Sequence, residues 1–149
     1  MTPPPHILVV ESPYYAHIAE LLRRGAEGAL AAAGATHERI QVPGSFELPA
    51  AIAVAARAAG DRFDGFVALG CVIRGETTHY DHICAESARG LQDLAVRDGL
   101  AIGYGILTCE NEAQALARAA PEGRDHAGAA VRACLAIIEL KRRFAQGGG

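Results

Sequence analysis

The chain has 149 residues, of which 50% are hydrophobic and 21% are charged, an ordinary composition for a globular protein. The formal net charge of −3 argues against a nucleic-acid-binding surface, which requires a basic stripe, and no run reaches the roughly 20 apolar residues that span a bilayer. Residues 1–11 lack the basic start and the cleavage site of a secretory signal, so we expect a cytoplasmic protein. The length suits one domain over residues 1–149, which we expect to be frayed at 1–5 and 145–149.

The first part of the chain contains apolar runs and turn residues that predict two strands, each followed by a helix. Ser12 and Pro13 are the residue types of a helix N-cap and first helical position, and Gly34 is expected to end that helix. The predicted elements are a strand at 6–10, a helix from Ser12 to Gly34, a second, weaker strand at 36–42 and a helix from Pro49 to about Ala59.

The second part begins with a strand at 66–73, which is apolar without alternation and is therefore expected to be covered on both faces. Asn111 and Gln114 have the spacing of a capping box at the start of a later helix. The remaining predicted elements are a helix from Tyr80 to Leu94 that ends at Asp98 and Gly99, a strand at 100–109, a helix after Asn111, a break at 121–125 and a last helix with Lys141, Arg142 and Arg143 at its end.

This order of elements indicates a parallel sheet with right-handed crossovers. Four strands with helices on both faces predict an α/β fold, a three-layer α/β/α sandwich around a four-stranded parallel, flavodoxin-like sheet. The four cysteines form no C-x-x-C pair and are expected as reduced core residues: Cys71, Cys84, Cys109 and Cys134.

Polar and aromatic residues follow every predicted strand, at 12–15, 44–47, 74–79 and around 104–110. Ligands of open parallel sheets bind just outside the carboxyl ends of the strands, so these residues mark a candidate site. Aromatic faces beside a carboxylate and hydroxyls suit a flat, polar heterocycle with a sugar-like tail.

His79 is the candidate acid and base, because an imidazole exchanges protons near neutral pH and this one follows Arg74 and two threonines at a strand end. A histidine that only satisfies a helix start is the alternative. His79 and His82 lie three residues apart, but no second ligand pair has the spacing of a zinc site, so no metal is expected. Ser87 lacks the G-x-S-x-G context of a serine nucleophile.

Residues 75–77 precede a helix N-terminus, which can hold phosphate or simply form a tight turn. Arg118 is suited to grip phosphate, yet an arginine in an alanine-rich stretch is as often a solvated face. Glu47 could bind polyol hydroxyls or only support a first helical turn. The chain has no Walker A lysine and no G-x-G-x-x-G, which disfavours nucleoside triphosphates and dinucleotides.

Three segments together match a known pattern: VPGSFELP at 42–49, ALGCVIRGETTHYD at 68–81, and the ILT…EAQAL…R run at 106–118. On these segments the chain resembles the lumazine synthase family over nearly its whole length, from Ile7 to about Phe144. The resemblance implies condensation of 5-amino-6-(D-ribitylamino)uracil with 3,4-dihydroxy-2-butanone 4-phosphate, with no metal and no organic cofactor. Riboflavin biosynthesis is the implied process.

The resemblance also implies roles for individual residues. Tyr14 would stack on the pyrimidine, His79 would give and take protons, and Tyr104 and Arg118 would reach the site from a neighbouring subunit as an aromatic wall and a phosphate clamp. The implied binding residues are Ser45, Phe46 and Glu47 for the ribityl chain, Cys71, Val72 and Ile73 for the uracil edge, and Glu76 and Thr77 for the butanone phosphate.

Two positions depart from the family pattern. Pro13-Tyr14 replaces a common Arg-Phe pair, and His126 replaces a common lysine, which would make a local positive charge depend on pH. Family members assemble as pentamers, and some pentamers close into icosahedral shells. Two other classes stay open at this point: a catalytically weak lumazine- or flavin-binding shell protein, and a flavodoxin-like electron carrier, which would need a hydroxyl-rich loop after the first strand.

Overall fold

The computed structural model describes residues 2–147. Its strands are β1 (His6–Glu11), β2 (Thr36–Gln41), β3 (Gly65–Ile73) and β4 (Ile102–Cys109). Its helices are α1 (Ala16–Ala32), α2 (Leu48–Ala59), α3 (His79–Asp98), α4 (Glu112–Ala119) and α5 (His126–Ala145), with short 3₁₀ helices η1 (Ser45–Glu47) and η2 (Gly60–Arg62).

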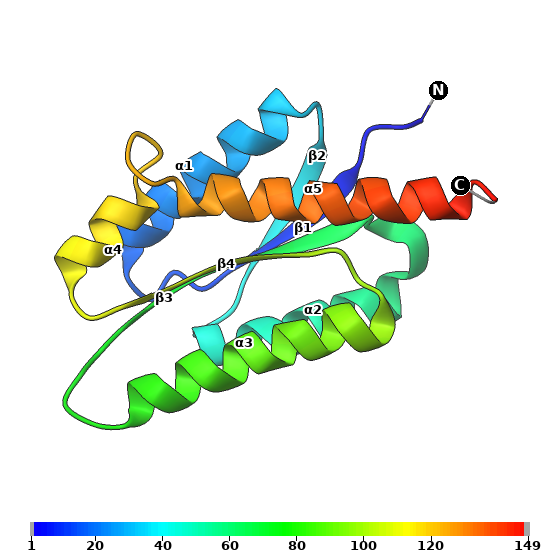
Figure 1. Cartoon of the computed structure of the whole chain (residues 1–149). Helices are drawn as coiled ribbons and strands as arrows, with labels where there is room; N and C mark the ends of the chain where they lie inside the picture. The colour runs from blue at the N-terminus through cyan, green and yellow to red at the C-terminus, as the bar shows by residue number, and fades with distance from the viewer. Residues whose placement is uncertain (1, 148–149) are drawn as a thin grey trace.

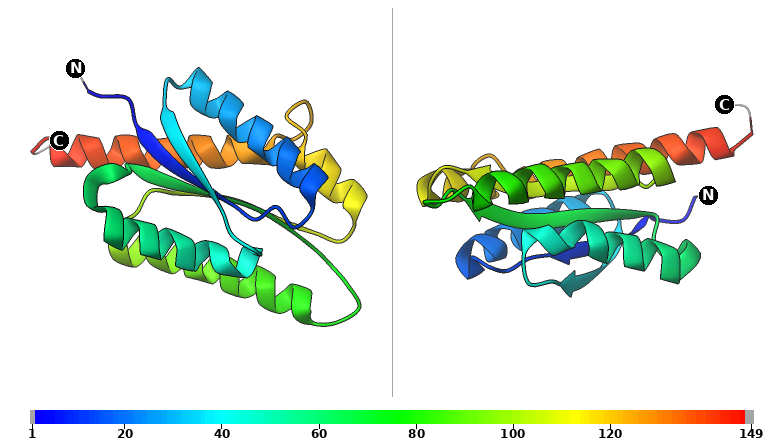
Figure 2. Two further views of the ribbon diagram at one scale, coloured as in Figure 1. Left: turned by 180° about the vertical axis from the view of Figure 1, so that it is seen from behind. Right: turned by 90° about the horizontal axis from the view of Figure 1, so that it is seen from below.

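The four strands form one parallel sheet in the order β2-β1-β3-β4. The helices α1, α4 and α5 cover one face, and α2 and α3 cover the other, as Figure 1 shows. Figure 2 shows the same layers from two further sides, with the start of β1 and the end of α5 at the same end of the molecule. The predicted three-layer, four-stranded parallel architecture is therefore confirmed.

Side-chain alternation along the buried strands supplies both halves of the core. Ile7 and Val9 belong to the apolar cluster on the α1 and α5 side, whereas Leu8 and Val10 belong to the cluster on the α2 side. β3 is buried from Gly65 to Cys71, as its uninterrupted apolar run predicts. β2, by contrast, has no fully buried residue and lies at one edge of the sheet.

The predicted start of the first helix is wrong. α1 begins at Ala16, and its N-cap is Tyr15, which makes no side-chain capping bond. Ser12 instead donates its backbone N–H to Leu69 O at 2.9 Å and its hydroxyl to Pro43 O at 3.4 Å. Ser12 therefore links β1 to β3 and to the segment that follows β2, because β1 ends beside both.

Other predicted boundaries and caps are confirmed. Gly34 follows α1 with a φ of +69°, a conformation that glycine adopts without strain. Asn111 accepts a hydrogen bond from Gln114 N at 2.9 Å, and the Gln114 side chain accepts one from Glu110 N at 2.8 Å. Positions 1, 148 and 149, which belong to the ends expected to be frayed, lie outside the described residues.

The cysteines are free thiols within the core, as expected. Cys71, Cys109 and Cys134 are buried, and Cys84 is half-buried. Burial raises the pKa of the Cys71 thiol to about 12, with smaller contributions from Cys109 and Cys84. Burial is likewise the largest cause that raises the pKa of the Cys84, Cys109 and Cys134 thiols, which disfavours the reactive thiolate form of all four. None of the helices described over residues 2–147 has the length and apolar character needed to cross a membrane.

Candidate active site

A cavity of about 290 Å³ lies at the carboxyl ends of β1 and β3, beneath the segment that follows β2. It contains most of the residues that the sequence singled out. Its lining consists of Tyr14, Tyr15, Gly44, Ser45, Phe46, Glu47, Cys71, Val72, Ile73, His79 and Ile83. We call this cavity the rim cleft.

One wall of the rim cleft is an open edge of β3. The pairing of β1 with β3 ends at Glu11 and Leu69, and the next contact is the bond from Ser12 N to Leu69 O. β3 continues to Ile73 beside β4 alone. The backbone edge of residues 70–73 that faces away from β4 is therefore open to the cleft, where N–H and C=O groups can bind the polar edge of a flat ligand.

The floor of the cleft depends on close packing between η1 and β3. Ser45 is buried, and a Cβ atom at Gly70 would lie only 2.6 Å from its hydroxyl oxygen. Glycine at position 70 therefore lets the 44–47 turn pack directly on the strand, and a larger residue would require the Ser45 and Leu48 side chains to shift. The turn thereby brings Phe46 and Glu47 to the cleft.

Two aromatic side chains stand exposed at the cleft. Tyr14 is 75% exposed and Phe46 is 55% exposed, although large aromatic rings are usually covered in a folded protein. The Tyr14 ring meets Tyr15 edge-on, with 5.0 Å between ring centroids. These faces are available for stacking on a planar ligand.

Tyr15 is a cleft residue that the sequence interpretation left without a role, as are Gly44 and Ile83. The Tyr15 ring packs on the core, and its hydroxyl lies near the Ile73 backbone. Burial is the largest cause that raises its pKa, followed by Cys71 and Tyr14. The only feature of the sequence that could have indicated a role for Tyr15 is its position as a second tyrosine directly after a strand. The sequence does not show that the Tyr15 hydroxyl lies near β3.

His79 is the first residue of α3, and its exposed side chain lines the cleft. Its backbone N–H donates to Thr77 Oγ1 at 3.3 Å, and no side-chain capping bond is made at this helix start. The His79 N–H is therefore satisfied by a neighbouring hydroxyl and not by the imidazole. The ring is available for proton transfer with a molecule in the cleft.

Arg74 is already engaged by the protein. Its guanidinium donates to Glu110 at 2.7 Å and to Asp81 at 3.3 Å, and it lies 4.3 Å from the centroid of the Tyr80 ring. The cation that the sequence placed next to His79 therefore joins the end of β4 to the start of α3. It is not a free anion-binding group.

Four predicted site residues lie outside the lining of the rim cleft. Glu76 and Thr77 are exposed in the segment before α3. Tyr104, on the edge strand β4, is 41% exposed, and Arg118, on α4, donates to Gln114 O at 3.1 Å. Their assigned roles toward phosphate or toward a neighbouring subunit stay predictions.

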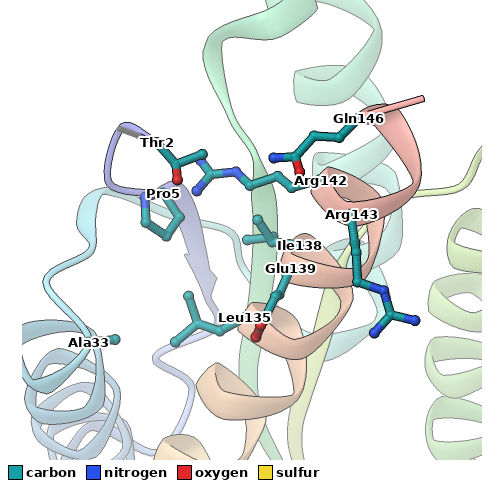
Figure 3. A pocket seen from close by; sticks show the side chains of 9 residues that line it. All are labelled: Thr2, Pro5, Ala33, Leu135, Ile138, Glu139, Arg142, Arg143 and Gln146. Carbon is teal, nitrogen blue, oxygen red and sulfur yellow. The ribbon is translucent and has the colours of Figure 1, made fainter. Parts of the chain in front are cut away.

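A second cavity, of about 430 Å³, lies at the opposite rim of the sheet, between residues 2–5 and the end of α5. Figure 3 shows Arg142 extending toward Thr2 and Pro5, while Arg143 points away from them. Arg142 forms an ion pair with Asp64 at 3.7 Å. This cavity contains none of the predicted site residues, so its larger volume does not make it the candidate site. In residues 2–147 no three His, Cys, Asp or Glu side chains group as metal ligands would.

Comparison with known proteins bears directly on the activity. The family described as 6,7-dimethyl-8-ribityllumazine synthase matches residues 4–142. The chain is 54% identical to 6,7-dimethyl-8-ribityllumazine synthase 1 of Rhizobium meliloti (strain 1021), over 95% of this chain and 94% of that protein. It is 53% identical to the synthase of Agrobacterium fabrum (94% and 97% covered) and 52% identical to that of Sphingopyxis alaskensis (95% and 99% covered). The chain therefore belongs to the 6,7-dimethyl-8-ribityllumazine synthase family, the enzymes that make this compound in riboflavin biosynthesis.

Proposed function

We propose that the rim cleft is where this enzyme condenses 5-amino-6-(D-ribitylamino)uracil with 3,4-dihydroxy-2-butanone 4-phosphate. The observation that carries the proposal is the meeting, in one cavity, of an open peptide edge, exposed aromatic rings and a histidine. A pyrimidine needs the first two for recognition, and the condensation needs the third. Residues 1–149 act as a single domain in this proposal.

The pyrimidine lies between the aromatic rings and the end of β3. Tyr14 stacks on its ring, and the backbone of Cys71, Val72 and Ile73 hydrogen-bonds to the uracil edge. The ribityl chain runs along η1, where hydroxyls meet Ser45, Phe46 and Glu47. Tyrosine keeps the stacking face of the phenylalanine common in the family, so the Pro13-Tyr14 departure is compatible with this role.

The second substrate binds near His79, with its phosphate held by the chain segment that contains Glu76 and Thr77 and by Arg118 of a neighbouring subunit. The amine of the pyrimidine attacks the ketone to form a Schiff base with loss of one water, phosphate is eliminated, and the ring closes with loss of a second water. His79 accepts and returns the protons. Both substrates are reactive, so holding them together supplies much of the acceleration, and the histidine contributes about 10²–10⁴-fold.

Assembly follows from the same proposal, because Tyr104 and Arg118 lie outside the cleft of their own chain. A neighbouring copy contributes them, which requires at least a homopentamer, and an icosahedral shell of pentamers is the larger form. No nucleic acid, membrane, metal or organic cofactor takes part, and the enzyme works in the cytoplasm. His126, at the position where the family commonly has a lysine, is exposed at the start of α5.

The deciding experiment is phosphate release from purified protein supplied with both substrates, with light scattering on the same sample. We expect release only when both substrates are present, and a scattering mass of five chains or a multiple of five. A protein that only binds lumazines or flavins would release no phosphate. An electron carrier would purify with a redox-active flavin, although Ser12, in the loop where its phosphate would sit, is already bonded to Pro43.

A further inference from the structure

Glu11 is a buried carboxylate at the end of β1, directly after the apolar run from Ile7 to Val10. It is 3% exposed and lies on the same face of the sheet as Ile7 and Val9, toward α1. A buried charge is costly unless it is paired and hydrogen-bonded. Its presence in β1 therefore calls for a specific role.

The partners of this carboxylate lie on the neighbouring strand. Glu11 Oε1 accepts a hydrogen bond from Arg39 Nη1 at 3.0 Å and one from Gln41 Nε2 at 2.9 Å. A small cavity of about 140 Å³ borders the group, and Glu20 and Arg23 of α1 also line it. The carboxylate thus joins the last residue of β1 to two side chains near the end of β2, Arg39 and Gln41.

The two strands end at this point, and both continue into the rim cleft. Val42 N donates to Glu11 O at 2.9 Å, and Ser12 donates its hydroxyl to Pro43 O. Two residues beyond Glu11 the chain reaches Pro13 and then the cleft tyrosines. Two residues beyond Gln41 it reaches the turn that carries Ser45 and Phe46.

Polar bonds hold the end of β2 itself, whereas Val42, Ser45 and Leu48 anchor the chain beyond it in the core. β2 is an edge strand without a fully buried residue, so the hydrophobic core does not fix its side chains. Its position depends on the backbone ladder with β1 and on polar side-chain bonds. The carboxylate of Glu11 is the buried member of those bonds at the end nearest the cleft.

We propose that Glu11 is a positioning residue for pyrimidine binding: through Arg39 and Gln41 it holds the 43–47 turn at the distance from β3 that the ligand requires. This inference rests on the proposed use of the rim cleft. It assigns no contact between Glu11 and the substrate. Its effect is on recognition of the pyrimidine and not on proton transfer.

Glu11→Gln keeps the shape of the side chain and removes its charge, so that an amide N–H₂ faces donors of Arg39 or Gln41. We expect KM for the pyrimidine substrate to rise about tenfold, with kcat and KM for the phosphorylated substrate within about twofold of wild type. The matched control is Glu38→Gln. Glu38 also joins β1 to β2, through His6, but at the opposite rim, and its loss should leave both KM values unchanged.

Gln41→Met provides a second test that does not disturb the buried charge, because Gln41 is exposed and the Glu11–Arg39 pair remains. We expect a smaller rise in the same KM. The proposal is overturned if neither variant changes KM for the pyrimidine, or if both substrates are affected equally. If Glu11→Gln does not fold, the result with Gln41→Met decides alone.

Phe46→Ala separates this inference from the proposed function. Phe46 lines the cleft directly, so its loss should weaken binding of 6,7-dimethyl-8-ribityllumazine measured by titration calorimetry. If Phe46→Ala has no effect, the cleft is not the pyrimidine site and the proposed function fails. If Phe46→Ala weakens binding and Glu11→Gln does not, only the positioning role of Glu11 is wrong.

Discussion

The two rims of the sheet differ in how their polar and aromatic residues are used. At the amino-terminal rim, His6 bonds to Glu38 at 2.8 Å and to Thr36 at 2.7 Å, and its ring stacks on Phe63 with 5.5 Å between centroids. Arg62 also donates to Glu38, at 3.0 Å. These groups bind one another, so the cluster serves to join β1 to β2.

At the carboxyl-terminal rim, comparable residue types leave their binding surfaces open. Tyr14 and Phe46 are exposed beside a cavity, and His79 lines it. Beyond Leu69, β3 is no longer paired with β1. Residue type alone therefore does not identify a site, whereas polar groups that the fold leaves open at the end of a parallel sheet do.

The largest effect is expected from His79→Ala. Removing the proton carrier should lower kcat by about 10²–10⁴-fold with little change in either KM, measured by steady-state phosphate release. His82→Ala is the matched control, since His82 is exposed on the same helix and does not line the cleft. Unchanged turnover of the His79 variant would remove this residue from the mechanism.

Arg118→Ala tests whether the rim cleft is completed by another chain. Loss of a charged donor to phosphate should raise KM for the phosphorylated substrate by roughly ten- to a hundredfold and leave KM for the pyrimidine unchanged. Arg132→Ala, which removes an exposed arginine of α5, serves as the control. An effect confined to the pyrimidine would show that Arg118 is not the phosphate clamp.

Gly70→Ala should disturb the floor of the cleft. The added Cβ would lie 2.6 Å from Ser45 Oγ and 3.2 Å from Leu48 Cδ1. We expect a loss of about 1–3 kcal/mol in the free energy of unfolding, measured with urea, together with weaker product binding. Gly75→Ala should be better tolerated, because a Cβ there has nothing within 4 Å; equal losses in the two variants would contradict the close packing of η1 on β3.

The smallest effect is expected at the opposite rim. His6, and then Arg62, lower the pKa of Glu38 below its ordinary value of 4.5. Because the folded state holds the carboxylate ionised, its contribution to stability is present above pH 4.5 and is lost as the pH falls through the lowered pKa.

Thermal unfolding of wild type and Glu38→Gln over a pH series measures this contribution directly. The wild type should unfold at the higher temperature near neutral pH, and the two proteins should converge in acid. If the difference in unfolding temperature between the two proteins persists or widens in acid, the ionised pair is not the cause of that difference. KM for either substrate should not change.

Much of the fold was predictable because it depends on local and periodic features. The alternation of Ile7 to Val10 places these residues in two core clusters, and the Asn111–Gln114 cap needs only neighbours along the chain. The rim cleft was largely predictable for a related reason. Carboxyl ends of parallel strands meet at one edge, so residues 44–47, 71–73 and His79 had to lie near one another.

The order of strands and helices along the chain, the buried faces and the motifs of the family all follow from the residue pattern alone. The contacts of the polar groups depend on the tertiary structure. Ser12 links two segments where an N-cap was predicted, and Arg74 is bound by Glu110. Tyr15 lies near Ile73, and Glu11 binds Arg39. Each of these contacts crosses between segments far apart in the chain. Local pattern fixes how a segment folds, but a hydrogen bond between segments depends on which strand lies beside which and where each one ends.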